Sequence, residues 1–285
     1  MSAPPIQCVV VLYKCTFGES RTVLSLLQCC REDKDIADQL SILFYDNSPD
    51  AQEFDATAWP SMRAAYQHPA ENGGLAAAYS EALAAAREQH IEWLLLLDQD
   101  TLLYPAFFHA LSAATKSPPA EICAIVPKLV QEGKLITPQV VAFFQNRYLP
   151  AGFSGVYPTK ITAMNSAACL RVQAIVDIGG FPAKYWLDYL DHVVFYWLQA
   201  AGGKVLILDM AIEHRLSLKN MEAEMSLTRY ANVLAAEWMF VRETRSGGGP
   251  LTHRLRLAKR AAVYILTMKN KDYAWQTLRA ALQQH

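Results

Sequence analysis

The stretch Trp93-Leu94-Leu95-Leu96-Leu97-Asp98-Gln99-Asp100 joins an unbroken apolar run to two carboxylates at its end. Such short apolar runs are typical of strands buried on both faces, as in a parallel sheet. Two aspartates at a strand end repel each other unless a cation lies between them, and a divalent cation with oxygen ligands meets that need. The alternative is a pair of turn or helix-capping aspartates, because aspartate is common where strands end.

The segments around this run alternate between strand and helix patterns. Apolar runs at 8–12 and 41–45 predict two further buried strands, and helical patterns cover 20–30 and 75–88. This alternation predicts an α/β fold with an open, largely parallel sheet flanked by helices. Later elements are expected as strands at 122–130, 139–144 and 204–208, a helix at 185–201, and mainly helices from 217 onward.

Polar residues follow each of the first three predicted strands. They are Tyr13-Lys14, Asp46-Asn47 and Asp98-Gln99-Asp100. Ligands of open α/β sheets bind outside the carboxyl ends of the strands, so we expect these clusters to converge at one edge. Asp46 and Asn47 are candidates to hydrogen-bond a nucleobase or ribose, or else form an Asx-turn.

The turn Asn72-Gly73-Gly74 precedes the helix predicted at 75–88. Its backbone N–H groups are candidates to approach a phosphate or a sugar. The turn lacks the full dinucleotide fingerprint and follows no clear strand, and the chain has no P-loop.

A second group of polar residues lies in the aromatic-rich segment after residue 185. Asp188 and Asp191 are candidate general bases there, or they mark a solvated helix start favoured by the helix dipole. Trp186 is a candidate to stack on a sugar ring, whereas most of the aromatic stripe is expected in the core. His214 is a candidate ligand only if it faces the carboxylate pair.

Composition limits the class of protein. The chain has 285 residues, 52% of them apolar and 19% charged, which excludes a disordered or fibrous protein. The formal charge of −1 argues against a protein whose whole surface binds nucleic acid. The charge is uneven, because residues 241–285 hold nine basic and two acidic side chains, a local charge of +7.

The sequence also bears on the compartment. The N-terminus has no basic region before its apolar run, so we expect no secretory signal. No stretch approaches the roughly 20 apolar residues that a membrane span needs. The six cysteines show no CxxC pair, and Cys8 and Cys169 fit small core residues, so a reduced cytoplasmic location is expected.

Taken in order, these motifs resemble a family 2 glycosyltransferase with the GT-A fold, closest to the bacterial rhamnosyltransferase-like branch. The resemblance runs through about residues 6–215 and implies a GT-A domain at 1–215 with a basic helical extension at 216–285. Its motifs are Val11–Lys14, Asp46–Ser48, Glu71–Ala78, Leu96–Thr101, Ile178–Phe181, Trp186–Asp191 and Ile212–His214.

The resemblance implies a role for each matched residue. Asp98, Asp100 and His214 would bind Mg²⁺ or Mn²⁺. Asp191 would be the catalytic base with Asp188 as a second catalytic carboxylate, and Trp186 and Asp188 would contact the substrate. The nucleotide-sugar donor would be bound by Tyr13, Asp46, Asn47, Asn72, Gly73, Gly74, Asp98 and Gln99.

The chain also departs from the family pattern. Lys14 stands where relatives usually have Asn, and Asn165-Ser166-Ala167 replaces a Ser-Gly step. Val193 and Trp197 replace the acidic and Arg positions that commonly follow the base. These changes leave the metal and base motifs intact and bear on the choice of acceptor and sugar.

The expected function is an inverting, metal-dependent transfer of L-rhamnose from dTDP-rhamnose. The acceptor would be a saccharide or lipid-linked saccharide in bacterial surface polysaccharide synthesis, and no nucleic acid is expected as a partner. The alternatives are a UDP-hexose donor, a metal-dependent nucleotidyltransferase, and a non-catalytic GT-A-like subunit of an assembly complex. A nucleotidyltransferase would need a glycine-rich, basic phosphate-binding loop near the N-terminus, which this sequence lacks. It would also give no role to the polar residues in segment 185–215.

The basic tail carries an apolar repeat at helical spacing. Its members are Leu251, Leu255, Ala258, Ala262 and Ile265 with Leu266, and His253, Arg254, Arg256, Lys259 and Arg260 lie between them. This pattern fits two interpretations equally, and one is peripheral contact with the inner face of the cytoplasmic membrane. The alternative is a helix packed on the catalytic body or on the partner in a homodimer.

Overall fold

The computed structural model describes residues 5–59, 63–141, 146–150, 152–214, 225–245 and 248–282. The chain divides into two compact units. Unit 1 comprises Met1–Gln139 and Tyr148–Arg215, and unit 2 comprises Val140–Arg147 and Leu216–His285.

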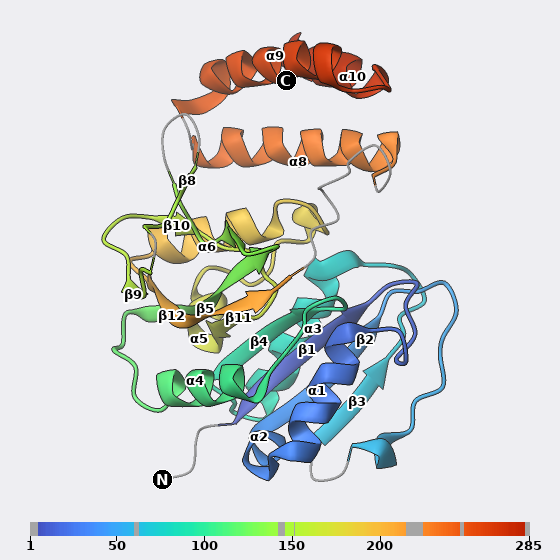
Figure 1. The fold of residues 1–285 in the computed structure, drawn as a ribbon, viewed down its shortest axis with the longest axis vertical. Coiled ribbons are helices and arrows are strands. Elements are labelled where there is room, and N and C mark those ends of the chain that lie inside the picture. The colour runs from blue at the N-terminus through green and yellow to red at the C-terminus, as the bar shows by residue number, and fades with distance from the viewer. Residues whose placement is uncertain are drawn as a thin grey trace. The chain divides into compact units, whose positions relative to one another are not determined.

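A mixed sheet forms the centre of unit 1 (Figure 1). Its strands are β1 (Ile6–Leu12), β2 (Leu40–Asp46), β3 (Arg63–Gln67), β4 (Trp93–Asp98), β5 (Ile122–Gln131), β6 (Lys134–Thr137), β9 (Gly155–Val156), β11 (Ala168–Arg171) and β12 (Lys204–Glu213). Within the described residues their order is β3-β2-β1-β4-β11-β5-β12-β9, with β6 beside β5. The neighbours from β3 to β4 are parallel, as are β5 and β12, whereas β11 is antiparallel to β4 and β5. The predicted mainly parallel α/β sheet is therefore confirmed.

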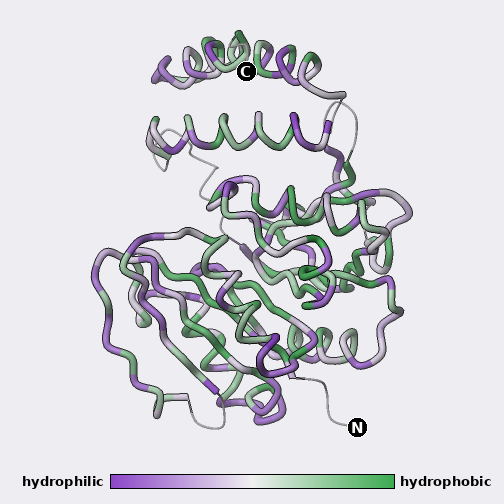
Figure 2. The backbone as a smooth tube through the Cα atoms, turned by 180° about the vertical axis from the view of Figure 1, so that it is seen from behind, coloured by the Kyte–Doolittle hydropathy of each residue, from purple (hydrophilic) through white to green (hydrophobic). Residues whose placement is uncertain are grey.

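Helices cover both faces of this sheet (Figure 1). They are α1 (Arg21–Glu32), α2 (Lys34–Gln39), α3 (Gly74–Glu88), α4 (Pro105–Thr115), α5 (Val172–Asp177) and α6 (Leu190–Ala200), with short 3₁₀ turns at Ala56–Ala58 and Ala183–Tyr185. Alternate residues of β1, such as Cys8 and Val10, join the core under α1, α2 and α4. The colouring of Figure 2 shows the central strands as nearly continuous apolar segments, which explains why the sequence reveals them.

Several elements differ from the sequence prediction. The helix predicted at 185–201 begins only at Leu190, because Tyr189 has a left-handed backbone with φ +65°. The strand predicted at 204–208 continues to Glu213, which carries it to His214. The strand predicted at 139–144 is short, since β7 spans Gln139–Val140 and residues 142–145 lie outside the described residues. Two other short strands are β8 (Arg147–Tyr148) and β10 (Ile161–Thr162).

The described part of unit 2 from residue 225 onward is mainly helical. It contains α8 (Leu227–Thr244), α9 (Gly249–Thr267) and α10 (Asp272–Leu282), in line with the helices expected after residue 217. Its core is built from Met225, Tyr230, Leu234, Trp238, Leu257, Tyr273, Ala280 and Ala281. The Trp238 Nε1–H donates to the carbonyl of Ala280 at 2.9 Å, which links α8 to α10. Among the described residues, no helix has both the length and the apolar character that crossing a membrane requires.

Candidate active site

The strand register brings the predicted polar clusters to one edge of the sheet. In β1, Leu12 lies opposite Asp46 of β2, and Val11 lies opposite Asp98 of β4. The Asn47 N–H donates to the Leu12 carbonyl at 2.8 Å, which holds the chain leaving β2 against the end of β1. The expected convergence of the strand ends is therefore present.

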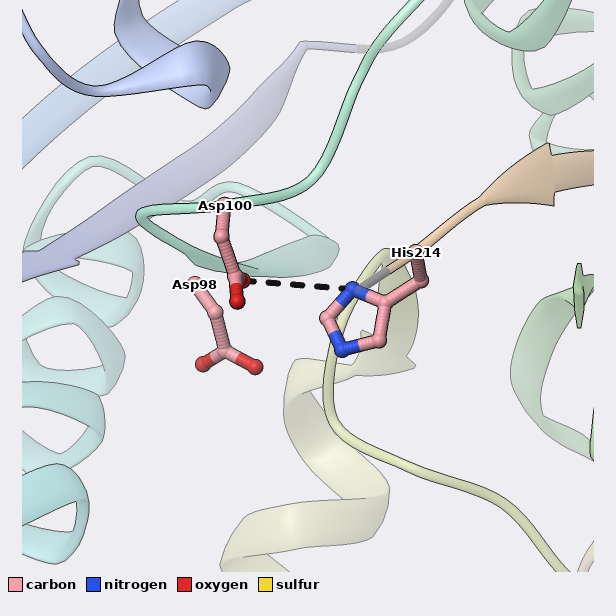
Figure 3. A group of neighbouring side chains, drawn as sticks. All are labelled: Asp98, Asp100 and His214. Carbon is pink, nitrogen blue, oxygen red and sulfur yellow. Dashed lines mark ion pairs between the residues drawn. The ribbon is translucent and has the colours of Figure 1, made fainter. Parts of the chain in front are cut away.

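Asp98, Asp100 and His214 form one cluster (Figure 3). One ligand atom from each side chain lies within 4.8 Å of the others. Asp98 ends β4, Asp100 follows in the turn, and His214 directly follows β12. A β-bridge between Thr101 and His214 fastens the two segments together.

The electrostatics of this cluster fit a divalent cation. The buried Nδ1 of His214 has no hydrogen-bond partner among the described residues and lies 3.9 Å from Oδ1 of Asp100. Burial raises the pKa of Asp98; a hydrogen bond from Ser166 opposes this, and the charges of Asp100 and Asp191 raise it further. Two repelling carboxylates and an orphaned imidazole nitrogen are chemically suited to Mg²⁺ or Mn²⁺.

The turn that carries the two aspartates is held by neighbouring backbone. Gln99 Oε1 accepts from the Tyr13 N–H at 2.8 Å, and the Gln99 carbonyl accepts from the Ser20 hydroxyl at 2.8 Å. Thr22 Oγ1 accepts from the Thr101 N–H at 2.8 Å. Gln99 therefore holds the turn to the end of β1, and its contact with a nucleotide stays a prediction. The Tyr13 ring is exposed, with Lys14 Nζ 5.3 Å from its centroid.

Asp46 lies deeper than its predicted role suggests. Its side chain is buried and accepts from the Ser48 N–H at 2.9 Å, Gln52 Nε2 at 2.7 Å and the Tyr66 hydroxyl at 3.0 Å. Burial by itself would raise the pKa of Asp46, but these hydrogen bonds hold it below its ordinary value. The carboxylate thus already has three internal donors, and its contact with a nucleobase stays a prediction.

The turn Asn72-Gly73-Gly74 connects two parts of the site. Asn72 Oδ1 accepts from the Gly74 N–H at 2.9 Å, and the Gly74 carbonyl accepts from Asn47 Nδ2 at 3.2 Å. The Ala76 N–H donates to the Trp186 carbonyl at 3.1 Å. Gly74 has φ +68°, and a Cβ there would lie 2.2 Å from that same carbonyl oxygen. Only glycine lets the turn and the Trp186 segment approach this closely.

Asp188 and Asp191 lie around the start of α6. Asp191 is in the first turn of α6, is partly exposed, and accepts from the His192 N–H at 2.7 Å through Oδ1. Its charge is among those that raise the pKa of Asp98, so it belongs to the same electrostatic environment. Asp188 is partly exposed in the preceding turn, and the side chain of Trp186 is exposed.

The sequence does not indicate that two further residues, Ser166 and Tyr79, belong to the site. Ser166 donates from its hydroxyl to Oδ2 of Asp98, although the sequence marks it only as a departure from the family pattern. Tyr79 of α3 is fully buried, and burial together with the charges of Asp98 and Asp191 raises its pKa well above the ordinary value. Tyr79 looks like a core residue in the sequence because it lies in an alanine-rich helix without a polar motif.

The fold and the carboxylate cluster at the strand ends define the class as GT-A. The family model described as "Glycosyl transferase family 2" matches residues 15–178, more than half of the chain. The chain therefore belongs to the family 2 glycosyltransferases. No curated protein matches it.

Solved structures share the fold at low sequence identity. GalNAc-T7 with UDP, GalNAc and Mn²⁺ has a TM-score of 0.58 and 13% identity, covering 82% of this chain and 47% of that one. The mannosyltransferase PcManGT from Pyrobaculum calidifontis, in complex with GDP-Man and Mn²⁺, has a TM-score of 0.56 and 16% identity over 98% and 74%. TarS of S. aureus has a TM-score of 0.57 and 14% identity over 98% and 49%. The chain thus spans about half of the length of GalNAc-T7 and TarS.

Proposed function

We propose that this glycosyltransferase is inverting and metal-dependent, and that it transfers L-rhamnose from dTDP-rhamnose to a saccharide or lipid-linked saccharide. The observation that carries the proposal is the cluster of Asp98, Asp100 and His214, whose ligand atoms lie within 4.8 Å of one another. Asp191 lies in the same electrostatic environment.

Asp98, Asp100 and His214 would hold Mg²⁺ or Mn²⁺. When bound, such an ion neutralises the negative charge that develops on the diphosphate leaving group. The Mn²⁺ in the related GalNAc-T7 and PcManGT structures supports this choice of metal. His214 supplies its free Nδ1 from the end of β12, and Ser166 orients Asp98.

Asp191 is the proposed catalytic base. Its carboxylate takes the proton of the acceptor hydroxyl while that oxygen forms a bond to the anomeric carbon. The bond from the anomeric carbon to the nucleoside diphosphate breaks, and its electron pair leaves with the diphosphate. One displacement from the opposite face inverts the configuration. Trp186 and Asp188, which precede Asp191 in the chain, are proposed to hold the sugar.

The donor is tested by thermal shift with Mn²⁺ across dTDP-, UDP- and GDP-sugars. The Asp-Gln-Asp-Thr motif favours dTDP-rhamnose. A UDP-hexose is the second candidate, because TarS 1–349 forms a complex with UDP-GlcNAc. We expect dTDP-rhamnose to raise the melting temperature most. A larger rise with a UDP-sugar would show that the donor is a UDP-sugar instead. If no sugar donor releases its nucleotide in the presence of Mn²⁺, a non-catalytic subunit is favoured.

The base is tested by Asp191→Asn. We expect kcat to fall about 10²- to 10⁴-fold, because the amide cannot accept the proton, while nucleotide binding is retained. The measurement is nucleotide release together with a nucleotide titration. Asp38→Asn, at an exposed position of α2, is the matched control and should transfer normally. Full transfer by Asp191→Asn would contradict the assignment.

The proposal also covers the acceptor, the cellular location and the oligomeric state of the enzyme. A lipid-linked acceptor would place the enzyme at the inner face of the cytoplasmic membrane, and transfer to vesicle-borne and water-soluble acceptors should be compared. The homodimer stays a prediction, which light scattering can test.

A further inference from the structure

Helix α9 has one face that builds the core of unit 2. His253, Leu257 and Ala261 are buried at a spacing of four residues, and Leu257 is completely inaccessible. Tyr264 continues this face and packs against the same core. These contacts fix which side of α9 points inward.

A second apolar face of α9 points away from that core. We call it the outer stripe, and its members are Leu251, Leu255, Ala258, Ala262, Ile265 and Leu266, all exposed. The exposed fractions are 72% for Leu251, 66% for Leu255 and 83% for Leu266. Steps of three and four residues place all six on one side of the helix. Single exposed leucines are ordinary, but a continuous apolar stripe marks an interaction surface.

Positive charge borders the outer stripe. Residues 244–271 contain seven Lys or Arg residues and no Asp or Glu. By helical spacing, Lys259 borders the stripe on one side and Arg254 on the other. Lys259 and Lys269 are exposed, whereas Arg260 is engaged with Glu237 and the Arg254 guanidinium lies 5.8 Å from the centroid of the Trp238 ring. Basic side chains beside an apolar stripe can extend their charged ends to phosphates while their stems stay in apolar surroundings.

We propose that the outer stripe of α9 lies in the surface of an anionic lipid membrane. The leucines would enter the boundary between headgroups and acyl chains, and the exposed Lys259 at the edge of the stripe would face the lipid phosphates. A second copy of the chain fits less well, because a symmetric contact would place the same basic residues opposite one another. Membrane contact through the outer stripe does not depend on the proposed sugar chemistry, so either proposal can fail without the other.

The test is co-sedimentation of the full chain with vesicles. One set contains phosphatidylcholine alone, and the other contains equal parts of phosphatidylcholine and phosphatidylglycerol. We expect binding to the anionic vesicles at low salt, weaker binding at high salt, and little binding to neutral vesicles.

Two variants separate the apolar and the electrostatic contributions. Leu255→Gln combined with Leu266→Gln should lower anionic partitioning at least about tenfold, because two leucines lose their burial in lipid. Lys259→Gln should lower it about fivefold. The matched control is Leu24→Gln, at a leucine of α1 that is 50% exposed, and its partitioning should equal that of the wild type. All variants should keep the wild-type melting temperature and donor turnover in solution.

Two results would overturn the proposal. One is no binding of the wild type to anionic vesicles at low salt, and the other is unchanged binding of the Leu255→Gln/Leu266→Gln variant. Light scattering identifies the competing occupant. If the wild type is a dimer that does not bind vesicles, and the Leu255→Gln/Leu266→Gln variant is a monomer, the outer stripe is a contact between two copies of the chain.

Discussion

Both units hold carboxylates beside other titratable side chains, but they surround them differently. In unit 2, Glu237 is buried and receives two hydrogen bonds from Arg260, Nη1 to Oε2 at 2.8 Å and Nη2 to Oε1 at 2.9 Å. His253 Nδ1 lies 3.7 Å from the same carboxylate. Burial by itself would raise the pKa of Glu237, but Arg260 and His253 bring it below its ordinary value. The charge is balanced within the unit.

In unit 1 the carboxylates meet each other. Asp98 and Asp100 lie with His214, and among the described residues no Lys or Arg forms an ion pair with either aspartate. Burial raises the pKa of Asp98, and the charges of Asp100 and Asp191 raise it further, although Ser166 and His214 oppose the rise. A carboxylate paired inside the protein stabilises the fold, whereas a cluster without its own cation is prepared for one from outside.

Removal of Arg260 should have the largest effect on stability. Arg260→Met leaves Glu237 buried without its main partner, so we expect a loss of about 3–5 kcal/mol in the free energy of unfolding. Denaturant unfolding measures this loss. Adding Glu237→Leu should recover most of it, and Arg242→Met, at an exposed position of α8, should change little. If Arg260→Met unfolds like the wild type, the pair does not balance the charge of unit 2.

A pH titration tests the histidine of the same group. Burial lowers the pKa of His253 to about 4 from an ordinary value of 6.5, although Glu237 opposes the shift. Between these pH values the unfolded chain binds more protons, so stability is fully present above pH 6.5 and falls toward pH 4. The loss should be on the order of 3 kcal/mol.

The matched variant His253→Leu should lose less stability over this range, because it cannot take up the proton. Melting temperatures of both proteins across the range measure the difference. Parallel curves for the two proteins would contradict the pKa shift.

Close backbone contact distinguishes the two units as well. Gly74 of unit 1 and Gly249 of unit 2 have similar φ angles, +68° and +77°, but an added Cβ meets Trp186 only at Gly74. Gly74→Ala should therefore cost about 2 kcal/mol more than Gly249→Ala and also lower transfer, because it displaces the Trp186 segment. Thermal unfolding and turnover of both variants measure this; equal losses would mean that the contact does not shape the site.

The sequence predicts the elements whose residues form a recognisable local pattern. The apolar strands β1, β2 and β4 bury both faces, so their runs stand out, and their polar ends indicate the site. The edge strand β3, Arg63–Gln67, has exposed and half-buried residues without an apolar run, so the sequence does not reveal it. The cluster of Asp98, Asp100 and His214 was expected from the family resemblance, and the structure brings these residues together.

Other parts of the site depend on tertiary contacts. The hydrogen bond from Ser166 to Asp98 joins residues that are 68 positions apart. The burial of Asp46 among Ser48, Gln52 and Tyr66 requires the chain after β2 to fold back, and no local pattern indicates this. The late start of α6 results from the left-handed Tyr189, a conformation that its residue type does not favour.

The central claim is that the carboxylate cluster of unit 1 requires a cation from outside. The most direct test is the melting temperature of the wild type and Asp98→Asn, each in EDTA and in Mn²⁺ with a nucleoside diphosphate. In EDTA the variant should be at least as stable as the wild type, because a carboxylate whose pKa rises on folding costs stability at neutral pH. With Mn²⁺ the wild type should gain stability and the variant should not. Lower stability of the variant in EDTA, or an equal gain for both with Mn²⁺, would contradict the claim.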